Sequence, residues 1–222
     1  MHIPDGFIDL KTAAATGIFS VSGFIFAVIK VKQYFRARVV VLMGIFAALL
    51  FAAQMLNFTI IGGTSGHLLG AALSTIILGP YAGGIIMAVV LLVQAFAFGD
   101  GGISALGANT FNMAIIGVIS AYLIYKIITK FSKSQTVFYI AAAVASWISV
   151  VAASVFCAAE LALSGTYSFK LALGSMIIAY MIIGLGEAAI TVAVIAFIDK
   201  VKPDLILTRN RGIKLESSQI EE

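Results

Sequence analysis

The feature that most constrains this chain is a series of long apolar stretches separated by short polar segments. Hydrophobic residues make up 61% of the 222 residues and charged residues 11%, whereas soluble domains average about 45–50% and about 25%. A helix needs about 20 apolar residues to cross the hydrocarbon core of a bilayer. The sequence therefore predicts an all-α integral membrane protein with about seven transmembrane helices, over residues 12–29, 39–56, 68–78, 81–98, 108–128, 137–163 and 171–198.

The stretch 68–78 is too short to cross a bilayer by itself, and it ends at Gly79-Pro80. It either forms a re-entrant hairpin with 81–98 or begins one continuous kinked helix over 68–98. A hairpin puts all basic residues except Lys11 and Lys170 on one side of the membrane, as the positive-inside rule requires. We therefore expect the hairpin, with the N-terminus outside and the C-terminus in the cytoplasm. Whether 68–78 spans the bilayer fully is left open.

The predicted organisation is one transmembrane domain, 1–200, with an inserted N-terminal segment, 1–9, followed by a polar cytoplasmic tail, 201–222. The start lacks the basic region of a cleavable signal peptide and carries Pro4 and Asp5. Met1 is therefore expected to persist in the mature protein. The net charge of +4 lies between apolar stretches, where it sets orientation, and does not indicate nucleic-acid binding.

The chain has two histidines, His2 and His67, and both fall on the predicted outer side. The free amine of Met1, the main-chain nitrogen of His2 and its ring Nδ1 can close five- and six-membered chelate rings around one metal. The ring of His67 would supply a fourth nitrogen. Planar nitrogen ligand sets suit Ni(II) and Cu(II), whereas Zn(II) prefers a tetrahedron. The alternative without a metal site is that His2 belongs to a disordered terminus and that His67 is a polar residue at the membrane surface.

Several polar residues near these positions are predicted to support the metal site from a second layer. Each also has a structural alternative, such as capping a helix or bonding between helices. The sequence assigns no role to Glu187, which lies deep in an apolar stretch. The second-layer candidates are Asp5, Ser65, Asp100, Asn109 and Asn112.

The sequence contains no motif for catalysis or for binding ATP. It has no P-loop, no His-Glu-x-x-His zinc-protease motif and no nucleophile–base set. We therefore expect a non-catalytic protein, with no cofactor, in which any ATP hydrolysis belongs to other subunits.

Three motifs resemble those of the nickel/cobalt-binding S components (NikM/CbiM type) of energy-coupling factor (ECF) transporters. They are Met1-His-Ile-Pro-Asp-Gly-Phe7, Gly62-Gly-Thr-Ser-Gly-His67-Leu-Leu-Gly70 and the run from Phe98 to Met113 that includes Asn109 and Asn112. The resemblance covers residues 1–200. It implies a six-helix S-component bundle plus one additional N-terminal helix, in the cytoplasmic membrane of a prokaryote.

The resemblance also implies a role and partners. Met1, His2 and His67 would bind Ni(II) or Co(II) at the extracellular face, for import driven by ATP. A transmembrane coupling (T) subunit, two cytoplasmic ABC-type ATPases and a further small membrane subunit would complete the transporter. Nickel and cobalt are not distinguished. Two other hypotheses stay open: a self-sufficient metal channel or carrier, and an S component for an organic vitamin.

Overall fold

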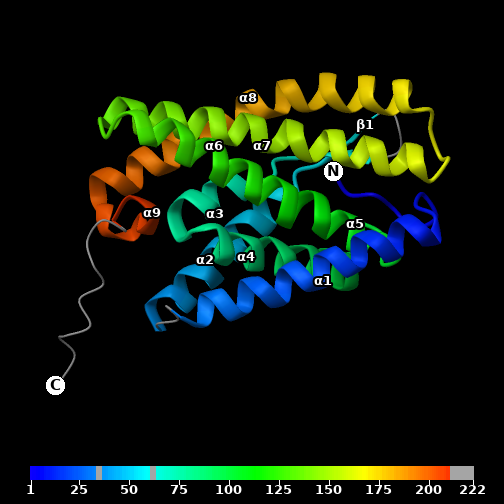
Figure 1. Ribbon diagram of the computed structural model, residues 1–222, viewed down its shortest axis with the longest axis horizontal. Coiled ribbons are helices and arrows are strands. Elements are labelled where there is room, and N and C mark those ends of the chain that lie inside the picture. The colour runs from blue at the N-terminus through cyan, green and yellow to red at the C-terminus, as the bar shows by residue number, and fades with distance from the viewer. Residues whose placement is uncertain (34–36, 61–63, 211–222) are drawn as a thin grey trace.

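The computed structural model describes residues 1–33, 37–60 and 64–210, and the chain is almost entirely helical in this part (Figure 1). Two short strands form the exception, as an antiparallel hairpin that pairs Thr59 with Ser65. The elements in chain order are α1 (Leu10–Lys32), α2 (Ala37–Gln54), β1 (Phe58–Ile60), β2 (Thr64–Gly66), α3 (Ala71–Leu78), α4 (Pro80–Val93), the π-helix η1 (Gln94–Phe98), α5 (Leu106–Thr110), the π-helix η2 (Phe111–Ile116), α6 (Gly117–Phe131), α7 (Gln135–Leu163), α8 (Phe169–Val201), the 3-10 helix η3 (Pro203–Leu205) and α9 (Leu207–Asn210).

Six helical segments in the described residues are long and apolar enough to cross a membrane. They are Leu10–Lys32, Ala37–Gln54, Pro80–Phe98, Leu106–Phe131, Gln135–Leu163 and Phe169–Val201. Large apolar side chains such as Ile18, Phe19 and Ile182 are exposed on them. Exposed apolar surface of this extent suits contact with lipid. The prediction of an all-α membrane protein is confirmed, and the seventh predicted segment is the short helix α3.

Helices α3 and α4 form a hairpin and not one kinked helix. Gly79 separates them with φ 92°, a conformation that favours glycine. Across the turn, a Cβ on Gly83 would lie 3.1 Å from the backbone of Thr75, so the two helices pack closely. Because α3 has eight residues and is only about 12 Å long, it cannot cross the bilayer alone.

The chain between His67 and α3 is irregular, and it is buried inside the bundle. Irregular backbone at membrane depth is tolerated only where protein satisfies its polar groups. Glu187 on α8 does so, accepting from the Leu69 N–H at 2.5 Å and the Gly70 N–H at 2.9 Å. Gln54 on α2 donates to the Leu69 carbonyl at 2.7 Å. Glu187, to which the sequence assigned no role, therefore fixes the backbone of Leu69 and Gly70 just before α3 begins.

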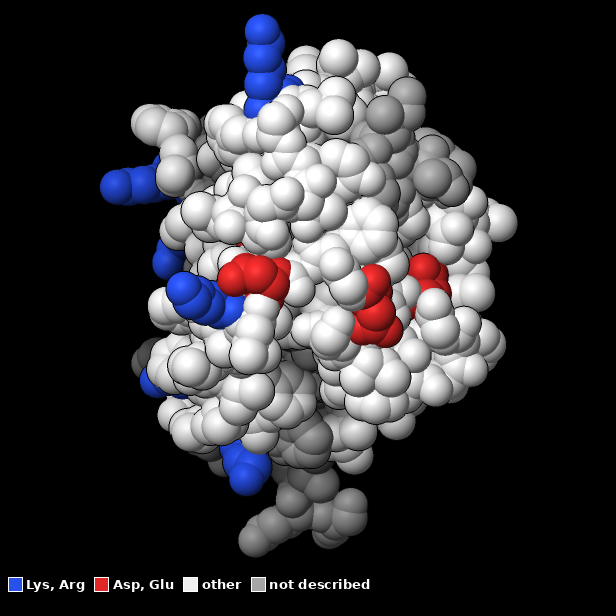
Figure 2. All heavy atoms as spheres, turned by 90° about the vertical axis from the view of Figure 1, so that its right-hand side faces the viewer, with Lys and Arg blue, Asp and Glu red and all other residues white. Residues whose placement is uncertain are grey.

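The bundle has two chemically different ends. The N-terminal segment and the 99–104 loop lie at one end, which we call the site end, while the ends of α1, α6 and α8 lie at the other (Figure 1). Viewed from the site end, acidic side chains lie near the middle of the face and basic ones at its periphery (Figure 2). The other end, the basic end, carries Lys30, Lys32, Arg38, Lys126, Lys130, Lys133, Lys200, Lys202 and Arg209.

The first part of the predicted polar tail folds back onto the bundle. Ile206 is fully buried, and the Thr208 hydroxyl donates to the Ile76 carbonyl near the end of α3. The apolar residues Ile206 and Leu207 explain why 203–210 does not extend into solvent. The rest of the predicted tail, 211–222, lies outside the described residues.

Candidate metal site

The first three residues are inserted into the bundle. Met1 and Ile3 are fully buried, and His2 is 4% exposed. Asn109 on α5 pairs with the backbone of Ile3, accepting from its N–H at 2.8 Å and donating to its carbonyl at 3.1 Å. Gly102 also donates to this carbonyl, at 2.9 Å. The main chain of the inserted segment is thus held at Ile3 by the Asn109 side chain and by the Gly102 N–H.

The loop after η1 is shaped to let this segment pass. A Cβ on Gly102 would lie 2.4 Å from the Asp5 nitrogen and 2.6 Å from the Pro4 carbonyl carbon, so no side chain fits there. Asp5 holds the other side of the loop, because its Oδ1 accepts from the Ser104 N–H at 2.7 Å and hydroxyl at 2.6 Å. These hydrogen bonds lower the pKa of Asp5.

Residues 6–9 then cross the site end to reach α1. The Phe7 carbonyl accepts from the Thr166 hydroxyl at 2.5 Å. Asp9 is the N-cap of α1, accepting from the Thr12 N–H at 3.1 Å and the Lys11 N–H at 3.3 Å. Asp9 therefore satisfies two backbone donors at the start of α1. The first helix thus anchors the segment that reaches into the bundle.

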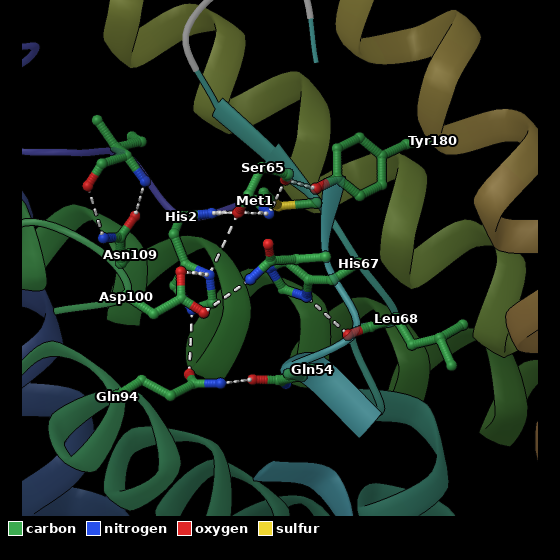
Figure 3. A network of polar contacts seen from close by, with 12 residues as sticks. Met1, His2, Gln54, Ser65, His67, Leu68, Gln94, Asp100, Asn109 and Tyr180 are labelled. Atoms are coloured by element: carbon green, nitrogen blue, oxygen red, sulfur yellow. Dashed lines mark hydrogen bonds and ion pairs between the residues drawn. The ribbon is translucent and has the colours of Figure 1, made fainter. Parts of the chain in front are cut away.

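The three nitrogens of the predicted chelate converge on one oxygen atom (Figure 3). Ser65 Oγ lies 3.2 Å from the Met1 amine, 3.1 Å from the His2 main-chain nitrogen and 3.3 Å from His2 Nδ1. The Ser65 carbonyl also accepts from the Met1 amine and, at 2.6 Å, from the Tyr180 hydroxyl. Strand β2 therefore places Ser65 where amine, amide and imidazole face the same point.

A chain of amides sets which ring nitrogen of His2 carries the proton. The Leu69 carbonyl can only accept, so the Gln54 NH₂ must face it, and Gln54 Oε1 then accepts from Gln94 at 3.0 Å. This leaves Gln94 Oε1 facing His2 Nε2 at 3.0 Å as an acceptor. His2 therefore carries its proton on Nε2, and Nδ1 keeps its lone pair.

His67 presents the opposite nitrogen. Its Nδ1 lies 2.8 Å from the Leu68 carbonyl, which can only accept, so Nδ1 carries the proton. Nε2 keeps its lone pair, is buried, and has no hydrogen-bond partner among the described residues. The two imidazole rings stack with their centroids 4.5 Å apart. A buried nitrogen without a partner calls for an explanation, and a ligand is one.

Burial keeps all three basic groups neutral near pH 7. It lowers the pKa of the Met1 amine to about 4 and that of His2 to about 3. The pKa of His67 falls well below 6.5, first through burial and then through the neighbouring amine and His2. Burial raises the pKa of Asp100, whose Oδ1 lies 3.3 Å from His2 Nδ1. The lone pairs of the site are therefore not blocked by protons at neutral pH.

The structure places the predicted second-layer residues in three groups. Ser65 and Asp100 touch the ligand nitrogens directly. Asn109 and Asp5 instead hold the inserted segment. Asn112 does not reach the site, because it donates to Glu160 at 2.6 Å. Its place in η2 explains this: the wider π-helical turn rotates it away from the face of Asn109.

Glu160, the partner of Asn112, is buried. It lies near the end of an apolar stretch, where a carboxylate could reach water, but it is only 5% exposed. Helices η2 and α7 pack together and enclose it.

Sequence reasoning missed three supporting residues. Gln54 and Gln94 are amides in apolar stretches, where burial is costly, but their mutual hydrogen bond depends on the end of α2 meeting the start of η1. Tyr180 gave no signal, because a tyrosine within an apolar helix is ordinary.

Known proteins are similar to this chain in sequence. A family model described as "Cobalt uptake substrate-specific transmembrane region" (CbiM) matches residues 2–205. A protein of Archaeoglobus fulgidus, provisionally named fused nickel transport protein NikMN, is 42% identical over 93% of this chain and 68% of its own length. The cobalt transport protein CbiM of Acetoanaerobium sticklandii is 32% identical over 87% of this chain and 82% of its own.

A solved structure shares the fold as well. The crystal structure of a transition metal transporter superposes with a TM-score of 0.88 at 33% identity, covering 97% of this chain and 100% of that one. Sequence family and fold therefore agree over nearly the whole chain. The chain belongs to the CbiM family of substrate-specific transmembrane proteins of nickel and cobalt uptake.

Proposed function

We propose that this chain is the substrate-capture subunit of an ATP-driven ECF-type importer. In this proposal it binds Ni(II) or Co(II) through the Met1 amine, the main-chain and Nδ1 nitrogens of His2, and His67 Nε2. The observation that carries the proposal is the convergence of three of these nitrogens on Ser65 Oγ beside the unpartnered His67 Nε2.

The spacing of the imidazoles supports a shared metal. Nitrogen ligands lie about 2 Å from such ions, which puts each ring centroid about 3.2 Å from the metal. Two rings at right angles around one ion would then have centroids about 4.5 Å apart. His2 and His67 are this close already, with centroids 4.5 Å apart, but their rings are stacked at 25° to each other, so one ring would have to turn for both to bind the same ion. Binding would require loss of the His2 amide proton, which now bonds to Ser65 Oγ.

The composition of the site supports a late transition metal. No group of three or more His, Cys, Asp or Glu residues able to hold a metal occurs in the described residues. The amine and amide nitrogens would complete the ligand set instead. A planar set of four nitrogens favours Ni(II) and Cu(II) and makes Zn(II) a poor competitor. The Irving–Williams order also predicts that Cu(II) binds at least as tightly as Ni(II).

The remaining parts of the proposal concern the membrane and the partners. The basic end is assigned to the cytoplasm by the positive-inside rule, and the metal site then faces outward. The sequence has no P-loop, so a coupling subunit and two ATPases would supply the energy, with a small additional membrane subunit. A prokaryotic cytoplasmic membrane is the corresponding location.

The test is a titration of the purified protein with Ni(II) and Co(II), comparing His2→Ala and His67→Ala with the native chain. Each variant removes an imidazole, so we expect at least a hundredfold weaker binding and loss of the absorption band of planar Ni(II). Lys11→Ala, at the exposed start of α1, is the matched control and should bind normally. Native-like binding by both histidine variants would refute the site. The tighter metal in the native chain identifies the favoured substrate.

A further inference from the structure

The basic end of the bundle contains a cavity that the metal site does not use. Its volume is about 410 Å³, and it lies between α6, α7 and α9. Its cationic walls come from Lys126 and Lys130 on α6, Lys133 in the α6–α7 turn and Arg209 on α9. No carboxylate is among the residues that line it.

The cations of this cavity are not neutralised from within. Among the residues that the structure describes, Lys126, Lys130 and Lys133 have no ion-pair partner. Arg209 is fixed in place, bonded to Asp199 and lying over the Phe138 ring at 4.9 Å. Asp199 compensates the charge of Arg209, so the excess positive charge of the cavity comes from the three lysines.

Hydroxyl groups and a helix terminus add donors for an anion. Ser132 and Ser134 line the cavity, and their hydroxyls accept from backbone N–H groups and keep a hydrogen to donate. Thr129 also lines it, but its hydroxyl donates to the Tyr125 carbonyl at 2.8 Å. Ser134 is the N-cap of the 29-residue helix α7, so the positive end of that helix adjoins the cations. Phosphate oxygens are the acceptors that such a combination of ammonium, guanidinium and hydroxyl groups suits.

An apolar stripe on α6 leads away from the cavity and indicates what carries the phosphate. Ile119, Leu123, Ile127 and Phe131 are spaced four residues apart, so they share one helix face. They are 49%, 51%, 54% and 83% exposed. This stripe faces lipid, like the other exposed apolar faces of the bundle, so an acyl chain of a lipid held at the cavity can lie along it.

We propose that this cavity binds the phosphate of an anionic phospholipid, with an acyl chain lying along α6. Basic pockets between transmembrane helices are typical sites for anionic headgroups. Positive residues at this end already set orientation. The half-open cavity, its hydroxyl lining and the N-terminus of α7 beside it are the features that orientation alone does not require. The proposal concerns the end opposite the metal site and does not rest on metal binding.

The test is native mass spectrometry of the detergent-purified full chain with phosphatidylglycerol or phosphatidylcholine added. We expect one phosphatidylglycerol per chain, bound at least tenfold more tightly than phosphatidylcholine. The triple variant K126Q/K130Q/K133Q should bind it about a hundredfold more weakly, given the attraction of each cation to an anionic lipid. The matched control is K32Q/K200Q/K202Q, which removes equal charge from exposed lysines outside the cavity. It should keep the preference.

Three results would overturn the proposal: no headgroup preference in the native chain, an undiminished preference in the cavity variant, or an equal loss in the control. Inorganic phosphate provides a further arm. If phosphate alone raised the unfolding temperature as much as the lipid, the cavity would be a free-anion site. The helical circular dichroism signal and the unfolding temperature without added lipid report whether the cavity variant is folded, and we expect both to stay close to those of the native chain.

Discussion

At the scale of single residues, the decisive property of the site is the direction in which each imidazole presents its lone pair. Gln94 and the Leu68 carbonyl hold opposite ring nitrogens of His2 and His67. His2 consequently offers the nitrogen that closes a six-membered chelate ring, and His67 offers the nitrogen farther from its own backbone. Such outer contacts fix the tautomer of ligating histidines in metal proteins generally.

Gln94 tests this account of the tautomer. Gln94→Leu keeps the bulk but removes the acceptor, so the His2 ring can take either tautomer or rotate. We expect metal affinity to fall by about 10- to 100-fold, the usual cost of losing such a partner. Gln94→Glu keeps an acceptor and should bind within a few-fold of the native chain. Equal affinity in all three proteins would show that Gln94 does not orient His2.

The dependence of binding on pH follows from the pKa shifts. Burial lowers the pKa of the Met1 amine from 8.0 to about 4 and that of His2 from 6.5 to about 3. The free energy that favours insertion of the N-terminal segment is therefore fully present above pH 8, and it is lost as the pH falls from about 8 towards about 4.

Metal binding releases the His2 amide proton, so we expect the affinity near pH 8 to fall about tenfold for each unit by which the pH is lowered. At lower pH the affinity should fall more steeply, because the amine and the imidazoles also compete for protons. Calorimetric titration between pH 5 and pH 8.5 measures this slope. A flat profile near pH 8 would show that the His2 amide keeps its proton and is not a ligand.

At the scale of elements, the loop after η1 and the N-terminal segment form a single unit. The backbone of Gly102 touches the backbone of Pro4 and Asp5. Asn109 on α5 bonds to both the N–H and the carbonyl of Ile3. The loop thus fixes the position of the N-terminal segment, which carries the proposed metal ligands Met1 and His2.

Gly102→Ala should dislodge this segment. Its Cβ would lie 2.4 Å from the Asp5 nitrogen, so backbone must shift. We expect at least tenfold weaker metal binding with an intact bundle, read from titration and from the helical circular dichroism signal. Gly174→Ala on α8, whose Cβ meets nothing within 4 Å, is the control and should change neither. Normal binding by Gly102→Ala would mean that the segment is not held by this loop.

The sequence was sufficient for the elements whose signal is local. Apolar length located the long helices, Gly79-Pro80 located the α3–α4 turn, and Asp9 located the start of α1. Features that depend on distant partners were not predictable. The rotation of Asn112 by η2, the burial of Glu160 and the folding of 203–210 onto α3 arise from packing that no local pattern encodes.

The same limit applies to the site. Two histidines and a chelating N-terminus were enough to propose the ligands, because chelate geometry is a property of adjacent residues. The supporting contacts of Gln94, Gln54 and Tyr180 required the positions of three helices.

At the scale of the whole molecule, the two ends of the bundle have different tasks in this account. The proposed metal site lies at the end with acidic side chains near its centre, where cations are attracted (Figure 2). The cationic cavity, between α6, α7 and α9, lies at the other end. Between them, α3 and its Glu187-bound entry fill the interior. A metal held at the site end must cross this packed region to be delivered, which agrees with a need for energy from partner subunits.

The central claim is that the free amine of Met1 binds the metal inside the bundle. The most direct measurement is a Ni(II) and Co(II) titration of the native chain against a chain with one glycine added before Met1. The added residue moves the amine out of the chelate, and a glycine appended after Glu222 serves as the control. We predict at least a hundredfold loss of affinity in the N-terminally extended chain alone. Equal binding by all three chains would contradict the account, because Met1 could not then be a ligand.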